Sequence, residues 1–283
     1  MKFHWPRKNL NLSIRTFLKA MADFLLVPSF LVCGISQAQD AGATADPVRF
    51  LGFHLDAGLH SFREDLLVPL GFNGPGLSIG GIFTRQNGNA FFNIRLRLGV
   101  AYLKNRFSQE AGLATLELRP AWLWKLDPRE GTGGFWGGIC VPLQINSDLG
   151  LHSWDDSHLY WLTTYSIGPA GEWRKSLTQK STAVVRMETP LIGWVSRPPT
   201  YRFNKQDALT SFSFHLSEPN RSLHFETVDN YRAVFLQMFL KREAGRSLFS
   251  YGLEFQYNYC NVPKKVYILN TSMILSYQWR IGR

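Results

Sequence analysis

Two histidines and an aspartate share one face of an extended segment near residue 55. His54, Asp56 and His60 occupy even positions, whereas Phe53 and Leu59 occupy odd positions. A carboxylate beside a histidine can orient the imidazole for acid–base chemistry, and two histidines with an aspartate can ligate a metal. No nucleophile is identifiable beside them, and positions 54 and 60 lie about 20 Å apart in a strand. We therefore expect separate polar side chains here, with no metal site and no cofactor.

A second pair has the spacing of a base and its nucleophile. His215 and Ser217 alternate with the apolar residues Phe214 and Leu216. In a strand this spacing places the imidazole and the hydroxyl on one face, the arrangement that nucleophilic catalysis needs. Two residues at this spacing also arise readily by chance, because histidine and serine are not rare in the chain. The pair supports hydrolysis as an alternative hypothesis, and the sequence as a whole favours a role without catalysis.

Charged residues recur in the middle of segments that are otherwise apolar at every second position. They are Arg95, Arg97, Glu117, Arg119, Glu172, Arg174, Arg186, Glu188 and Glu254. Opposite charges on neighbouring strands stabilise a sheet by about 0.2–1 kcal/mol per pair. Two interpretations stay open: a filled, salt-bridged interior, or an arginine-biased channel that favours anionic solutes.

The composition excludes several classes of protein. With 45% hydrophobic, 14% aromatic and only 18% charged residues among 283, the chain lacks the balance of a disordered protein. It contains no phosphate-binding glycine loop, no dinucleotide-binding motif and no GxSxG sequence. The basic residues are dispersed along alternating segments, so we expect no nucleic-acid partner.

The first 38 residues have the order of a secretory signal: a basic leader, an apolar run over 24–35, and small residues at Ser36 and Ala38. We predict that residues 1–38 are a cleaved signal peptide, that 39–47 form a short periplasmic segment, and that 48–283 form the folded domain. Five of the 31 basic residues and one of the 21 acidic residues lie in this leader. The remaining chain carries 26 and 20, a net charge of +6 rather than +10.

After residue 40 the recurring pattern has a period of two, which is typical of strands with two different faces. The predicted strands are 48–62, 74–86, 89–104, 111–126, 134–147, 158–174, 181–195, 231–242, 247–260 and 265–281. Short links alternate with longer ones at 63–73, 105–110 and 148–157, and Asn87-Gly88 is the sharpest hairpin signal. We expect the outer loops near 63–73, 148–157 and 196–222 to be contact surfaces.

The middle of the chain allows two strand counts. Residues 208–217 alternate as a strand does, and the apolar positions change from odd to even near Asp229-Asn230. A turn at this point predicts 12 strands, whereas a bulge, with 196–220 as one long outer loop, predicts ten. The prediction favours 12, with ten as the alternative.

The apolar face of the predicted strands indicates which medium surrounds the folded domain. Strands of about ten or more residues are long enough to cross a bilayer when tilted, and a soluble core could not bury so many charges. Aromatic residues also recur at strand ends, as a girdle at a membrane interface requires. They are Tyr102, Trp122, Trp124, Trp161, Tyr165, Tyr259 and Trp279. Because backbone groups in lipid must pair internally, we predict an all-β fold, a closed antiparallel transmembrane β-barrel.

These features together resemble a Gram-negative outer-membrane β-barrel protein. The matching elements are the signal, the alternating strands and the last strand, Met273–Ile281, which is similar to the signal read by the outer-membrane assembly machinery. That family signal normally ends on Phe or Trp, whereas here Trp279 is followed by four more residues. The resemblance implies an outer-membrane location and partners in the assembly machinery, membrane lipid and lipopolysaccharide. It implies no activity.

The resemblance also bears on the two functional hypotheses. The first is a structural or small-pore protein without catalysis. The second is a lipid-modifying hydrolase that uses His215 and Ser217, because outer-membrane phospholipase A and the lipid A deacylases use a similar pair. The alternation turns the two side chains inward, whereas the phospholipase pair faces the lipid.

Overall fold

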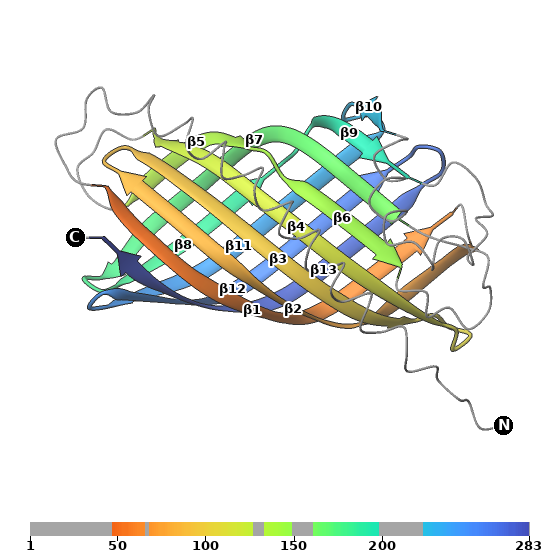
Figure 1. Cartoon of the computed structure of the whole chain (residues 1–283), viewed down its shortest axis with the longest axis horizontal. Helices are drawn as coiled ribbons and strands as arrows, with labels where there is room; N and C mark the ends of the chain where they lie inside the picture. The colour runs from red at the N-terminus through yellow and green to blue at the C-terminus, as the bar shows by residue number, and fades with distance from the viewer. Residues whose placement is uncertain (1–46, 66–67, 127–132, 149–160, 198–222, 283) are drawn as a thin grey trace.

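The computed structural model describes residues 47–65, 68–126, 133–148, 161–197 and 223–282. Every regular element in these ranges is a β-strand (Figure 1). The strands are β1 (Val48–Glu64), β2 (Val68–Asn87), β3 (Ala90–Lys104), β4 (Glu110–Lys125), β5 (Gly134–Cys140), β6 (Leu143–Asp148), β7 (Trp161–Thr178), β8 (Ser181–Glu188), β9 (Ile192–Ser196), β10 (His224–Glu226), β11 (Tyr231–Ala244), β12 (Ser247–Cys260) and β13 (Val266–Ile281). Among the described residues, no helix is long and apolar enough to span a membrane.

Hydrogen bonds close the sheet into a ring of antiparallel strands. The order around the ring is β7, β5, β4, β3, β2, β1, β13, β12, β11 and β8, and β8 pairs with β7 again. β6 continues β5 beyond an interruption at Val141-Pro142, since both pair with β4 and β7. β9 continues β8 in the same way beyond Pro190. From β7 round to β8 each strand of the ring pairs on both sides, as a lipid environment requires, whereas β10 pairs with β9 alone among the described strands.

The ring passes through ten strands, and the preferred count of 12 is not confirmed. β10 and β11 do not pair with each other as two arms of a hairpin. Instead β10 pairs with β9, and β11 pairs with β8. Since β8 and β9 are two parts of one interrupted strand, β10 and β11 lie beside successive parts of that strand. A turn at 227–230 separates β10 from β11. In this turn the backbone carbonyl of Thr227 accepts hydrogen bonds from the backbone N–H groups of Asn230 and Tyr231. The change of apolar phase near Asp229 is therefore an interruption within one side of the ring. Residues 208–217 lie outside the described part of the chain.

The two ends of the barrel differ in their connections. One end, called here the short-turn end, has the turns at 88–89, 179–180 and 245–246, the connection from Lys125 to Gly134, the start of β1 and the end of β13. Gly88 and Gly245 take φ values of 53° and 62° there, a conformation that glycine adopts readily. The opposite end, called the loop end, has the links 65–67, 105–109, 149–160, 197–223 and 261–265.

The predicted long loop over 63–73 is wrong. β2 begins at Val68, and Gly71 and Asn73 pair with Arg63 and Ser61 of β1. Pro75 occupies a place where the ladder between β2 and β3 skips from Asn73 to Gly76. The missing N–H of proline is tolerated where no ladder bond is needed. The other two predicted contact loops fall almost entirely outside the described residues.

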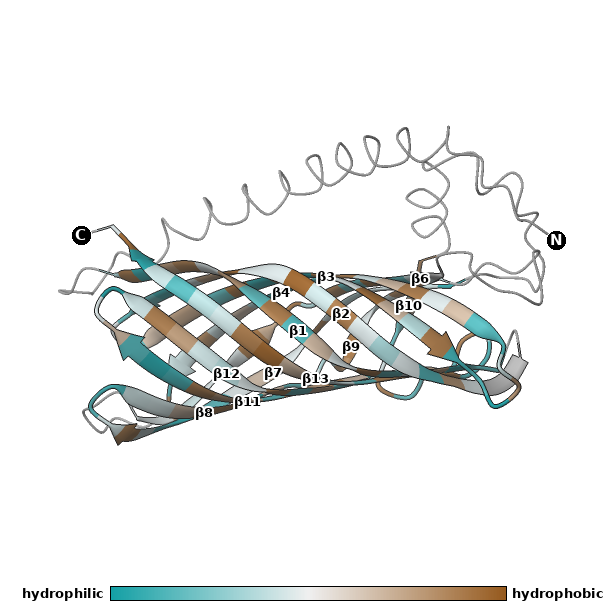
Figure 2. Ribbon diagram, turned by 90° about the horizontal axis from the view of Figure 1, so that it is seen from below, coloured by the Kyte–Doolittle hydropathy of each residue, from teal (hydrophilic) through white to brown (hydrophobic). Residues whose placement is uncertain are grey.

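The faces of the strands separate by polarity. Outward positions are apolar and exposed, as at Phe53, Leu77 and Met273, which are 54%, 59% and 66% exposed. The intervening positions are buried and mostly polar, and Figure 2 shows this alternation along the ribbons. A closed ring with apolar residues outside and polar residues inside is the architecture of an outer-membrane β-barrel, so the resemblance is confirmed at that level.

Two apolar clusters lie inside the ring on either side of its polar middle. The larger one, near the loop end, includes Phe62, Leu103, Tyr231 and Ile268. The smaller one, near the short-turn end, includes Leu123 and Trp136. Each member of this smaller cluster is at most 5% exposed. Cys140 and Cys260 belong to different clusters, and both are free thiols.

Candidate functional site

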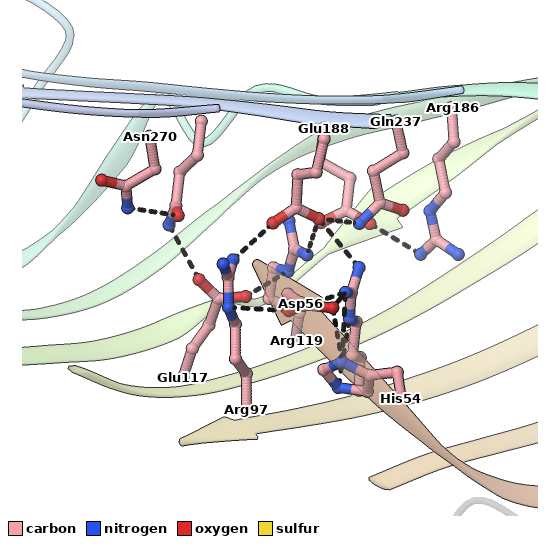
Figure 3. Close-up of polar contacts among 12 residues, drawn as sticks. His54, Asp56, Arg97, Glu117, Arg119, Arg186, Glu188, Gln237 and Asn270 are labelled. Carbon is pink, nitrogen blue, oxygen red and sulfur yellow. Dashed lines mark hydrogen bonds and ion pairs between the residues drawn. The ribbon is translucent and has the colours of Figure 1, made fainter. Parts of the chain in front are cut away.

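A network of ionised and amide side chains fills the middle of the barrel. Its members come from strands on opposite sides of the ring and point toward one another across the lumen (Figure 3). The network, called here the central cluster, consists of His54, Asp56, Arg95, Arg97, Glu117, Arg119, Gln144, Gln237, Glu254, Gln256 and Asn270. All of them are at most 5% exposed.

Glu254 on β12 is the hub of the central cluster. Arg95 and Arg97 of β3 donate to its two carboxylate oxygens over 2.8 Å and 2.6 Å, and Arg119 of β4 donates to Oε2 over 2.6 Å. The amide of Gln237 on β11 donates to the same oxygen. Charge-assisted hydrogen bonds of this length are the strong class. One carboxylate thus joins three arginines from the opposite wall of the barrel.

The arginines need this partner because of the register of their own strands. Arg95 lies directly opposite Arg119 in the β3–β4 ladder, and like charges so placed repel each other. Arg97 is opposite Glu117, while Glu117 Oε1 forms an ion pair with Arg119 Nε, 2.7 Å away on the same strand. Cross-strand pairing alone would leave Arg95 facing another cation. The contact across the lumen removes that conflict.

Asp56 on β1 is the second acceptor of the cluster. Its Oδ2 accepts from Arg97 Nε over 3.0 Å, and its Oδ1 lies 2.9 Å from His54 Nδ1. The other imidazole nitrogen of His54 lies 2.9 Å from the carbonyl oxygen of Leu96. Both ring nitrogens are therefore occupied within the central cluster, and Arg95 also lies 3.4 Å from each of them. The pair positions Arg97 rather than activating a nucleophile.

Two amide side chains donate hydrogen bonds to one carboxylate oxygen of Glu117. Gln144 of β6 and Gln256 of β12 each donate to Glu117 Oε2 over 2.8 Å. Asn270 of β13 then donates to Gln256 Oε1 over 3.0 Å. Buried carboxylates are tolerated when their acceptor sites are filled in this way. These amides extend the cluster to the far side of the ring.

A second charged group, nearer the short-turn end, joins β7 and β8. Arg174 pairs with Glu172 over 2.5 Å, and Arg186 pairs with Glu188 over 2.7 Å. Arg186 also donates to Asn93 on β3 over 3.1 Å, which bridges the interior. The guanidinium of Arg174 lies 4.4 Å from the ring centroids of both Phe91 and Trp136. Ion pairing and stacking together fill this part of the lumen.

A third ion pair lies at the loop end. Arg197 pairs with Glu64 and also donates to the backbone carbonyls of Val262 and Lys264. Both side chains of the pair are only 1% exposed. This contact joins the end of β1 to the segment that precedes β13, on the outer side of the larger apolar cluster.

The interior charges compensate one another. In the central cluster Arg95, Arg97 and Arg119 meet three carboxylates, those of Asp56, Glu117 and Glu254. Arg97 and Arg119, at the middle of the lumen, are only 2% and 1% exposed. A water-filled channel would leave such side chains in contact with solvent. The arrangement therefore fits a filled barrel rather than an anion-selective pore.

All nine charged residues that the sequence singles out are buried, at 9% exposure or less. Sequence reasoning missed Gln144, Gln237, Gln256 and Asn270 as partners, although the alternation placed them on the polar face. It also missed Arg197 and Glu64. The pairing of a carboxylate with arginines more than 130 positions away leaves no mark in local spacing.

The remaining predicted site residues have different surroundings. His60 is buried farther along β1, and the described residues contain no group of three side chains suited to a metal. His215 and Ser217 lie outside the described part of the chain. Of the aromatic residues assigned to a girdle, Tyr102, Trp124 and Trp279 are 42%, 45% and 37% exposed. Trp122, Tyr165 and Tyr259 are partly exposed.

Trp161 differs from the rest of the predicted girdle. Only 4% of it is exposed, and its indole N–H donates to the Ser196 hydroxyl over 3.2 Å. A residue in this position does not present its ring to a membrane interface in the described structure. An aromatic residue at a strand end can be exposed to the membrane interface or buried, because burial also depends on the neighbouring segments. Position at a strand end therefore does not distinguish these two cases.

Comparisons with known proteins assign no function to this chain. No protein-family model matches the chain, and no curated protein matches it in sequence. The translocator domain of the autotransporter NalP from Neisseria meningitidis is similar in structure, with a TM-score of 0.41 and 11% identity over 93% of this chain and 98% of that one. The outer membrane protease OmpT from Escherichia coli is similar with a TM-score of 0.43 and 5% identity, over 86% and 99%. Neither similarity transfers a substrate or a reaction to this chain.

Proposed function

We propose that this protein is an outer-membrane β-barrel of a Gram-negative bacterium that acts without catalysis, as a closed structural barrel. The observation that supports this role most directly is the convergence of three arginines on Glu254 across the lumen. A neutral, hydrogen-bonded network at mid-barrel blocks solute passage and holds opposite walls together. A ring of ten strands is also near the size at which side chains fill the interior, since open porins have about 16–18 strands.

The orientation in the membrane follows from the connections. Short turns of such barrels face the periplasm and longer loops face outward, so we place the loop end at the cell surface. There the barrel contacts lipopolysaccharide through its exposed cations, Arg106, Lys264 and Lys265 among them. The last strand, β13, supplies the segment that the assembly machinery reads. Export by the signal at residues 1–38 precedes both steps.

Three measurements test this proposal together. The protein should fractionate with outer membranes, resist carbonate extraction and run faster on gels before boiling than after. Vesicles that contain it should not swell in an isotonic solution of a small sugar. Soluble protein after carbonate treatment contradicts the membrane assignment, and swelling at the rate of a porin control contradicts the closed lumen.

A further inference from the structure

Four arginines lie on neighbouring segments at the short-turn end of the barrel. In the order of the ring they are Arg85 near the end of β2, Arg49 near the start of β1, Arg280 near the end of β13, and Arg246 in the turn before β12. Arg49 and Arg85 share the outward face of the sheet, whereas Arg280 pairs with Phe50 and is one position out of phase with them. Arg49 is directly opposite Arg85, and the backbone N–H of Arg280 donates to the carbonyl of Arg246. We call these four residues the arginine rim.

The rim lacks acidic partners in the part of the chain that the structure describes. None of its four guanidinium groups has a carboxylate within ion-pair distance there, and Glu243 is the one exposed acidic residue at this end in those ranges. The Nε of Arg85 is buried without a hydrogen-bond acceptor. Two like charges directly opposite each other destabilise a sheet. The arrangement is therefore unfavourable unless an anion from outside the barrel lies between the side chains.

The loop end of the same barrel wall differs. Arg63 pairs with Asp65 over 3.0 Å, and Lys104 pairs with Glu110 over 3.0 Å. Arg232 donates to the carbonyl of Val228 over 2.7 Å. Arg63, Lys104 and Arg232 thus have oxygen partners within the chain, whereas the rim arginines have no carboxylate partner in the described ranges.

The height of the rim matches a layer of lipid headgroups. Arg49 and Arg63 lie on β1 fourteen positions apart by their numbers, which corresponds to about 47 Å along a strand. At a tilt of roughly 40° this separation is about 36 Å along the membrane normal. The apolar band of a barrel is only about 25 Å tall, so the two arginines cannot both lie within it. Arg49, at an outward position next to the short turns, is assigned to the level of phosphates and glycerol on that side.

We propose that the arginine rim binds the phosphates of anionic glycerophospholipids in the leaflet on the short-turn side. Guanidinium groups donate to phosphate oxygens with bidentate geometry. An anionic headgroup between Arg49 and Arg85 offsets their repulsion. The adjoining acyl chains lie on the apolar outer positions below, such as Leu51 and Trp279, which are 41% and 37% exposed. This inference rests on the membrane location in the proposed function.

The test measures lipid selectivity on the whole protein purified from membranes. Vesicles of phosphatidylcholine contain the protein and trace spin-labelled phosphatidylglycerol or spin-labelled phosphatidylcholine, and the bound fraction of each is measured by electron paramagnetic resonance. We expect phosphatidylglycerol to associate at least about fivefold more strongly, since one basic residue near an anionic surface contributes a factor of that order. The variant with Arg49, Arg85, Arg246 and Arg280 each changed to Gln should lose most of this preference.

A matched variant separates the rim from cationic charge in general. It changes Arg63, Arg106, Lys264 and Lys265 at the loop end to Gln, removes the same charge, and should keep the preference. Equal loss in both variants, loss in the loop-end variant alone, or no preference in the wild type overturns the proposal.

Heat-modifiable gel mobility in each sample shows whether the barrel has formed, so loss of the barrel and loss of lipid selectivity are told apart. If the fourfold variant does not fold, the Arg49→Gln/Arg85→Gln pair replaces it, and no decrease in preference in that pair rejects the binding site. A variant with the four arginines changed to Lys should retain part of the selectivity.

Discussion

The arginines of the central cluster and those of the rim have opposite relations to the rest of the chain. Arg95, Arg97 and Arg119 are buried, and each contacts at least one carboxylate within 3.0 Å. Arg49 and Arg280 are exposed and have no such partner among the described residues. The same side chain therefore closes the lumen in one region and leaves positive charge for an external anion in the other. Pairing within the chain, rather than residue type, distinguishes structural from binding arginines.

The largest effect should follow removal of the hub. Glu254→Ala leaves three buried arginines with two carboxylates, so we expect the free energy of unfolding to fall by about 3–5 kcal/mol. Urea titration in phosphatidylcholine vesicles, followed by tryptophan fluorescence, measures the change. Glu110→Ala is the control, because it breaks an ion pair whose side chains are 52% and 41% exposed, and it should change stability little. A similar small change for both variants would show that the central cluster does not stabilise the barrel.

A double-mutant cycle gives the next largest effect. Glu254→Gln and Arg119→Gln each leave an uncompensated charge, whereas the double variant restores neutrality. We expect the double variant to be more stable than the sum of the single losses predicts, by about 1–3 kcal/mol. Additive losses contradict direct coupling between the two side chains. The cycle is measured by the same urea titration.

At the rim the sign of the effect should reverse. Arg49→Gln relieves the repulsion with Arg85, so in uncharged lipid we expect the free energy of unfolding to rise by about 0.2–0.5 kcal/mol. Arg242→Gln is the control, because Arg242 is also exposed at this end but lies opposite Ser181 and Phe249. It should leave stability unchanged. A clear loss of stability in Arg49→Gln but not in Arg242→Gln contradicts the account of an unpaired rim.

The smallest expected effect concerns the hydrolase hypothesis. A closed structural barrel needs no nucleophile, so the wild type and Ser217→Ala should release equal, background amounts of fatty acid from phospholipid and from lipid A. A titrimetric or mass-spectrometric assay with the detergent-solubilised protein measures the release. Activity in the wild type that is lost in Ser217→Ala assigns catalysis to this pair and replaces the proposed function.

Much of the barrel can be predicted from the sequence, because strands between lipid and a polar lumen alternate apolar and polar residues with a period of two. Long strands with lipid on one side and a polar lumen on the other alternate without interruption, so the bounds of β3, β4, β11, β12 and β13 fall within a few residues of the prediction. The same pattern assigns Arg95, Glu117 and Glu254 to one face. The strand count was harder, since the change of phase near Asp229 fits either a turn or an interruption.

Contacts across the lumen could not be predicted. Alternation states which face a residue occupies but not which distant residue on the same face it meets. Arg95 and Glu254 are 159 positions apart, and their contact depends on the circumference and stagger of the closed ring. Local pairing predicted cross-strand partners, and for Arg95 this partner is another arginine. The loop predicted at 63–73 failed for a related reason, because strand pairing outweighed the local preference of glycine and proline.

Conductance of the wild-type protein tests the closed lumen most directly. Purified protein, shown to be folded by its heat-modifiable mobility, is inserted into a planar lipid bilayer in concentrated potassium chloride, with a known porin as the positive control. The central cluster and the apolar clusters on either side predict no stepwise current at either polarity. Stable current steps with anion selectivity, recorded at low voltage from the folded protein, would contradict a lumen closed by Glu254 and its three arginines.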